Sequence, residues 1–151
     1  MTLAAFFQKF WLLPAERRRV LLQAAILLPV IGLMLRLVGY DRVYSTLLHR
    51  SVKNGAPPNG ISPEAVALMV AVVVRRHLYK GKCLQQSLTL WYLLRRRGLD
   101  PELRIGVRKA GDQLEAHAWV QYQGRALNDS EDVGLRYTAF KGLTLPSARW
   151  V

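Results

Sequence analysis

The sequence predicts an α+β fold in which a helix carrying the single cysteine packs on a small antiparallel sheet, after an N-terminal helical segment. Two observations lead to this prediction. Apolar residues recur at helical spacing up to Gly98, and after the segment GLDP they alternate with polar residues at strand spacing. With 151 residues, 51% of them hydrophobic, the chain is long enough for one domain with a substantial core.

Residues 1–50 form the predicted N-terminal helical segment. Pro14 and Glu16 suit the first turn of a helix, where a missing N–H costs little and a negative charge is favourable. The 16 residues from Val20 to Leu35 carry no charge. A membrane-spanning helix needs about 20 apolar residues, so we expect a buried or interfacial helical hairpin instead. Pro29 should break or kink it, and an amphipathic helix should follow up to about Arg50.

Residues 51–61, rich in glycine, proline and asparagine, are the predicted linker, and residues 62–151 the predicted core. Ser62 as N-cap and Pro63 at the first helical position begin a helix that extends to about His77. Its apolar stripe consists of Val66, Val70, Val73 and Val74.

Cys83 lies where a glycine-containing turn becomes an apolar helix that ends at Gly98. Free backbone N–H groups and the positive end of the helix dipole favour a thiolate there, and Lys80 and Lys82 would act in the same direction. A buried packing thiol is the alternative interpretation of a lone cysteine. The arginines at 95–97 suit the negative end of the dipole and therefore need no ligand.

Strands are predicted at 102–108, 114–122 and 126–129, and YTAF (137–140) is compatible with a further one. His117 and Trp119 lie on the face of the second strand opposite to its small aliphatic residues, so His117 is not simply one more core position.

The length of the loop after Tyr122 decides which residue lies opposite His117. A three-residue loop, Tyr122-Gln123-Gly124, places Asp129 there, whereas a two-residue loop places Ser130 there and turns Asp129 to the other face. We expect the three-residue loop, and we expect the triad to fail with the other register. His117 would then act as a base toward Cys83, with Asp129 orienting the imidazole.

The runs CLQQSLTLWYLLRRRGLDPELRIGVRK and AHAWVQYQGRALND, with LLPAERRRVLL near the N-terminus, resemble the B proteins of lasso-peptide biosynthesis. The resemblance is close over residues 83–129. It implies a transglutaminase/papain-like core with Cys83 as nucleophile, His117 as general base and Asp129 as its orienting group. The implied reaction is hydrolysis of one peptide bond, which releases the leader of a ribosomally made precursor before a cyclase closes the macrolactam.

The implied partners are the precursor leader, a separate leader-recognition protein and an asparagine-synthetase-like cyclase. A separate recognition protein is expected because the chain begins directly with the helical segment, which resembles the split form of the family. No metal-ligand spacing or phosphate-binding glycine loop occurs, so we expect no cofactor. One oxyanion donor is expected to be the Cys83 N–H, and candidates for the second are Tyr79, Gln85 and Gln86.

The charge is uneven along the chain. Residues 1–97 carry 15 Lys and Arg against 3 acids, which accounts for the whole net charge of +12. An acidic leader, its recognition protein or an anionic lipid surface would each suit this region, so peripheral membrane contact is compatible with the sequence. With a single cysteine and no secretory cleavage pattern, we expect a cytoplasmic protein.

Three alternatives remain open at this stage. Another acyl-transfer enzyme of the same fold would use an amine in place of water. A basic binding protein would dock on nucleic acid or a membrane surface, although no nucleic-acid recognition motif is present and we expect no such partner. A small membrane-embedded structural protein is disfavoured by the proline and glutamine within the apolar run.

Overall fold

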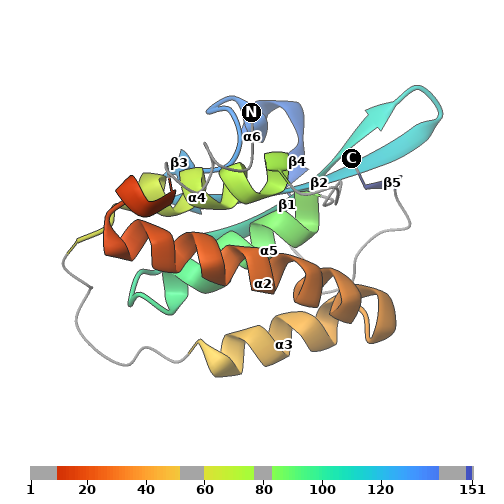
Figure 1. Cartoon of the computed structure of the whole chain (residues 1–151). Helices are drawn as coiled ribbons and strands as arrows, with labels where there is room; N and C mark the ends of the chain where they lie inside the picture. Colours follow the sequence, from red (N-terminus) through yellow and green to blue (C-terminus); the bar gives the residue numbers. More distant parts are fainter. Residues whose placement is uncertain (1–9, 52–59, 77–82, 140–148, 151) are drawn as a thin grey trace.

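The structure is a computed structural model that describes residues 10–51, 60–76, 83–139 and 149–150. Within these ranges, helices precede a small sheet, as the sequence predicts (Figure 1). The helices are α2 (Ala15–Leu37), α3 (Tyr40–Arg50), α4 (Pro63–Arg76), α5 (Cys83–Arg95) and α6 (Val133–Arg136), and the strands are β1 (Glu102–Ala110), β2 (Gln113–Tyr122), β3 (Arg125–Ala126), β4 (Thr138–Ala139) and β5 (Arg149–Trp150).

Of the break or kink predicted at Pro29, the break does not occur, because helix α2 continues through this residue. A proline inside a helix removes one backbone hydrogen bond, and the packing of α2 against α4 and α5 offsets that loss. The chain turns at Gly39, whose φ of 81° is a left-handed conformation that favours glycine. The hairpin predicted within residues 20–35 is therefore not present, and the chain bends ten residues after Pro29, between α2 and α3.

The predicted helix signals around α4 and α5 are confirmed. The Ser62 hydroxyl accepts a hydrogen bond from the Ala65 N–H at 3.2 Å, as an N-cap does. Helix α5 ends in a turn in which Gly98 has a φ of 74° and the Leu99 N–H bonds to the Leu94 carbonyl at 3.3 Å. This is the Schellman pattern, in which glycine supplies the left-handed residue.

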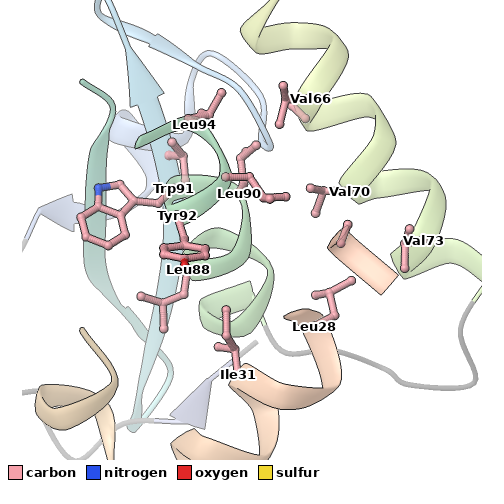
Figure 2. Close-up of a cluster of buried hydrophobic side chains, with 14 of the residues drawn as sticks. Leu28, Ile31, Val66, Val70, Val73, Leu88, Leu90, Trp91, Tyr92 and Leu94 are labelled. Atoms are coloured by element: carbon pink, nitrogen blue, oxygen red, sulfur yellow. The ribbon is translucent and has the colours of Figure 1, made fainter. Parts of the chain in front are cut away.

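Helix α5 lies at the centre of the core, with α2 and α4 on one side and the sheet on the other (Figure 1). Nearly all of its residues are buried, as expected for a helix enclosed on every side. The core includes side chains from before and after residues 51–61, although the division into a helical segment, a linker and a peptidase core stays a prediction. Figure 2 shows ten of these core residues: Leu28, Ile31, Val66, Val70, Val73, Leu88, Leu90, Trp91, Tyr92 and Leu94.

The sheet has the antiparallel order β3-β2-β1-β4, and β5 pairs in parallel with the start of β2. One face, which includes Ile105 and Ala118, packs against α5. The other face carries His117 and Trp119 and is covered by residues that follow β3, including Tyr137. Trp119 is therefore fully buried, and the face opposite the aliphatic residues forms a second small core.

Candidate active site

Cys83 is the first residue of α5 and lies at the outer edge of β2. Its thiol is within reach of the backbone N–H of Ala118, and Ser87, one turn later in α5, donates a hydrogen bond to the Ala118 carbonyl at 2.9 Å. The side chains of Cys83 and Ser87 therefore both reach the backbone of Ala118 on the edge of β2, at a point that β3 does not cover. The buried start of α5 is thus held directly beside the strand that carries His117.

Burial raises the pKa of the Cys83 thiol above its ordinary value. The backbone N–H groups of Ala118, Leu84 and Cys83 lower this pKa, because they would stabilise a thiolate, and the negative charge of Asp129 raises it further. The expected stabilisation by the start of a helix is present, but burial outweighs it. Lys80 and Lys82 lie outside the described residues. The described surroundings of Cys83 therefore favour the thiol over the thiolate.

His117 and Asp129 form a close pair, in which Nε2 of the imidazole contacts Oδ2 of the carboxylate. Both side chains are mostly buried. The other imidazole nitrogen, Nδ1, is buried and has no hydrogen-bond partner among the residues that the structure describes. With Nε2 donating to the carboxylate, Nδ1 carries the free lone pair and is the atom that can accept a proton.

The loop that brings Asp129 near His117 has two residues, so the predicted three-residue loop is wrong. Tyr122 pairs with Arg125 and Gln121 with Ala126, which leaves Gln123 and Gly124 as the loop. Their φ values of 50° and 79° are those of a type I′ turn, which suits the twist of a hairpin. Regular pairing extended to residue 130 would place Ser130 opposite His117, but β3 ends at Ala126 and the predicted strand over 126–129 is too long.

The contacts of Asn128 explain how the Asp129 carboxylate reaches His117 although the loop has two residues. Its Oδ1 accepts a hydrogen bond from the Val120 N–H at 2.8 Å, and its Nδ2 donates one to the Ser87 hydroxyl at 2.9 Å. The Asn128 side chain thus makes the hydrogen bond to β2 that the backbone of a continued strand would make. The backbone itself leaves the sheet at this point, which lets the Asp129 carboxylate reach His117. The expectation that this register removes the pairing was wrong because it assumed a continuous strand.

Asp129 is held on its second oxygen as well. Oδ1 accepts hydrogen bonds from the Ser130 N–H at 2.7 Å and from Arg136 at 2.8 Å. Burial raises the pKa of the Asp129 carboxyl, but the hydrogen bonds from His117 and Ser130 lower it by more, so its pKa lies below the usual value. The group is a carboxylate at neutral pH and can stabilise an imidazolium.

Sequence reasoning missed Tyr137, whose ring stacks on the His117 imidazole with 5.0 Å between ring centres. Gly106, directly opposite His117 on β1, makes room for it. A Cβ added at Gly106 would lie 2.8 Å from the Tyr137 Cβ and 3.0 Å from the Trp119 ring. A glycine inside a strand indicates such a close approach, although it does not reveal which residue approaches.

The three candidates for the second oxyanion donor, Tyr79, Gln85 and Gln86, differ in their positions. Gln85 is buried and donates a hydrogen bond to the Leu28 carbonyl of α2, so it serves the core rather than an oxyanion. Gln86 lines an open pocket of about 430 Å³ between α4 and the 127–129 turn, together with Asn128 and Asp129. Tyr79 lies outside the described residues. Of the two candidates among the described residues, Gln86 is thus the one that shares a pocket with Asp129.

No group of three His, Cys, Asp or Glu residues within the described ranges could hold a metal ion. His49 is exposed on α3, away from the pair of His117 and Asp129, and His77 is among the residues left undescribed. Cys83, His117 and Asp129 supply a thiol, an imidazole and a carboxylate, which are the groups used in nucleophilic acyl transfer.

The chain belongs to the transglutaminase-like superfamily, because the model of that family matches residues 19–141. A stretch of 64 residues is 30% identical to the microcin J25-processing protein McjB of Escherichia coli, and it covers 42% of this chain and 30% of that protein. These findings support the fold class and the resemblance to the B proteins of lasso-peptide biosynthesis. No solved structure matches the chain.

Proposed function

We propose that the protein is a cysteine peptidase that removes the leader from a lasso-peptide precursor. The observation that carries this proposal is the position of Cys83 at the buried start of α5, beside a strand on which His117 is paired with Asp129 and keeps Nδ1 free. The likeness to McjB, a protein named for processing microcin J25, supports the choice of substrate class.

The reaction follows from these groups. Nδ1 of His117 takes the thiol proton, and the Cys83 sulfur attacks the carbonyl carbon of the scissile peptide bond. The imidazolium, stabilised by Asp129, then protonates the leaving amine of the core peptide, which leaves the leader as a thioester on Cys83. Water, deprotonated by His117, hydrolyses the thioester and restores the thiol. The Cys83 N–H and Gln86 are the proposed donors to the oxyanion.

The proposed partners follow from the substrate. A separate leader-recognition protein would present the precursor, and an asparagine-synthetase-like cyclase would use the released amine to close the macrolactam. The reaction would take place in the cytoplasm, where a lone thiol stays reduced. The proposed peptide-binding region is the pocket beside Gln86, Asn128 and Asp129, with Glu64 and Arg75 of α4 on its other side.

Membership of the transglutaminase-like superfamily also supports a second candidate, transfer of the acyl group to an amine. The two reactions share every step up to the thioester and differ in the nucleophile that resolves it. Mass spectrometry separates them, because hydrolysis yields a leader with a free carboxylate and aminolysis yields a leader joined to the amine.

The test incubates the protein with a candidate precursor and recognition protein and follows release of the leader by mass spectrometry. We expect no cleavage by Cys83→Ala and a loss of at least about 10²-fold in His117→Ala, which lacks the base. Asp129→Ala should lose less. His49→Ala, a histidine removed from the exposed surface of α3, is the matched control and should cleave normally. Full activity of Cys83→Ala would disprove the proposal.

A further inference from the structure

Helix α2 has an outer face that carries a continuous row of exposed aliphatic side chains. They are between 45% and 73% exposed, although residues of this kind are normally buried. Their spacing of three or four residues puts them on one side of the helix. We call this row the outer stripe, and it consists of Leu22, Ile26, Val30, Leu33 and Leu37.

The opposite face of α2 is part of the core. Val20, Ala24, Leu28 and Ile31 are buried there, against α4 and α5. By length and composition alone, α2 is the described helix that could cross a membrane. Crossing would remove this inner face from the core, whereas a helix lying parallel to a surface keeps it in place. The fold therefore favours contact along the side of α2 over insertion.

The charges around the outer stripe are mostly positive. Arg19 stands at the start of α2, where its guanidinium lies 3.8 Å from the Glu16 carboxylate, and Arg36 stands at its end, both exposed. Over residues 10–51 there are six arginines against two acids, Glu16 and Asp41. An apolar row with cations at both ends matches an anionic lipid surface, where the acyl chains take the aliphatic groups and the phosphates take the guanidinium groups.

We propose that α2 lies in the plane of an anionic membrane surface, with the outer stripe among the lipid chains and the flanking arginines at the headgroups. This surface is separate from the thiol, imidazole and carboxylate, because it lies on the side of α2 that faces away from α5. The proposal is therefore independent of the peptidase assignment, and either can fail alone.

The test measures binding of the full chain to vesicles by flotation. We compare phosphatidylcholine vesicles containing phosphatidylglycerol with vesicles of phosphatidylcholine alone, at low and high salt. The protein should bind the anionic vesicles, and binding should weaken with salt, because screening reduces the contribution of the arginines. The double variant Ile26→Gln/Leu33→Gln should lower the partition coefficient by about tenfold or more.

Leu114→Gln/Leu135→Gln is the matched control, since it removes two exposed leucines that lie on the β1–β2 hairpin and on α6. This control should bind vesicles like the wild type, and thermal unfolding should show that both double variants are folded. The proposal would be overturned if the wild-type protein does not bind anionic vesicles, or if Ile26→Gln/Leu33→Gln binds them as strongly as the wild type. Self-association in light scattering that the stripe variant loses, without vesicle binding, would assign the stripe to a second copy of the chain.

Discussion

At Cys83, opposing effects act on one thiol. Burial and the nearby Asp129 charge favour the protonated form, while the N–H groups at the start of α5 and at Ala118 favour the thiolate. Burial and the Asp129 charge dominate, so the pKa of the thiol lies above its ordinary value. In the proposed mechanism the sulfur becomes a nucleophile when a base removes its proton, and this base is Nδ1 of His117, which has no hydrogen-bond partner among the described residues.

The raised pKa of Cys83 predicts the pH dependence of its alkylation. A thiol whose pKa lies above the ordinary value of about 8.5 holds less thiolate at neutral pH than a free cysteine does. The rate with iodoacetamide should thus keep rising above pH 8.5 in the folded protein. The urea-unfolded chain is the matched control, since the same thiol then titrates normally and no second cysteine interferes. A plateau reached below about pH 7 would contradict this prediction.

Asn128 should matter for both stability and catalysis. Asn128→Ala leaves the Val120 N–H and the Ser87 hydroxyl without this partner, which should lower the free energy of unfolding by about 1–3 kcal/mol. It should also slow cleavage, because Asp129 loses its support. Gln113→Ala, which removes an exposed amide at the start of β2, should change neither quantity. Unchanged unfolding and unchanged cleavage in Asn128→Ala would show that Asn128 does not position the carboxylate.

The pairing of His117 with Asp129 could be anticipated at the residue scale, although the backbone path that brings the two side chains together could not. Strand alternation separates His117 from the aliphatic face, but Asp129 was assigned as its partner through a three-residue loop, and the loop has two residues. The bridging function of Asn128 depends on contacts with Ser87, 41 residues away in sequence, and no local pattern predicts such a contact. Their catalytic roles stay a prediction.

At the scale of elements, local signals predicted α3, α4, α5 and the two long strands, but not α2, where a hairpin was expected. Ser62, Pro63 and Gly98 act through their own backbone geometry, and the structure has the cap and the turn that they indicate. Pro29 misled because the packing of α2 overrides a local preference. The short elements β3, α6 and β5 depend on tertiary contacts, and they are too brief to show a period.

The sheet predicts a specific effect of adding one methyl group to β1. Gly106→Ala would place a Cβ 2.8 Å from the Cβ of Tyr137, so the ring and the imidazole beneath it must move. We expect a loss of about 1–3 kcal/mol in the free energy of unfolding and slower cleavage. Gly134→Ala is the matched control, because its added Cβ would meet no atom within 4 Å. Equal behaviour of the two variants would mean that Tyr137 does not pack closely at this site.

For the whole molecule, the central position of α5 connects the candidate site to the rest of the core. Its first residue is Cys83, one side of it contacts the sheet that carries His117, and the other side contacts α2 and α4 (Figure 1). The N-terminal helical segment therefore packs against α5, the helix that begins with Cys83. The family match over residues 19–141 also extends across both sides of the predicted linker.

This arrangement predicts that α2 and the candidate site unfold together. Ile31 is 0% exposed and lies in the core near Leu28, whereas Ile26 on the same helix is 65% exposed (Figure 2). Ile31→Ala should lower the free energy of unfolding by about 2–5 kcal/mol, since it leaves a cavity against α5. Ile26→Ala should stay within about 0.5 kcal/mol of the wild type.

Two probes show whether the loss of stability in Ile31→Ala extends to the start of α5. Circular dichroism reports the helices, and alkylation of Cys83 reports opening at the start of α5, both as a function of urea. In a single cooperative unit, Ile31→Ala shifts the two midpoints by the same amount. If residues 1–50 formed an independent unit, the substitution would shift an early helical transition and leave the protection of Cys83 unchanged. Coincident shifts would thus establish α2 as part of the body that holds the nucleophile in place.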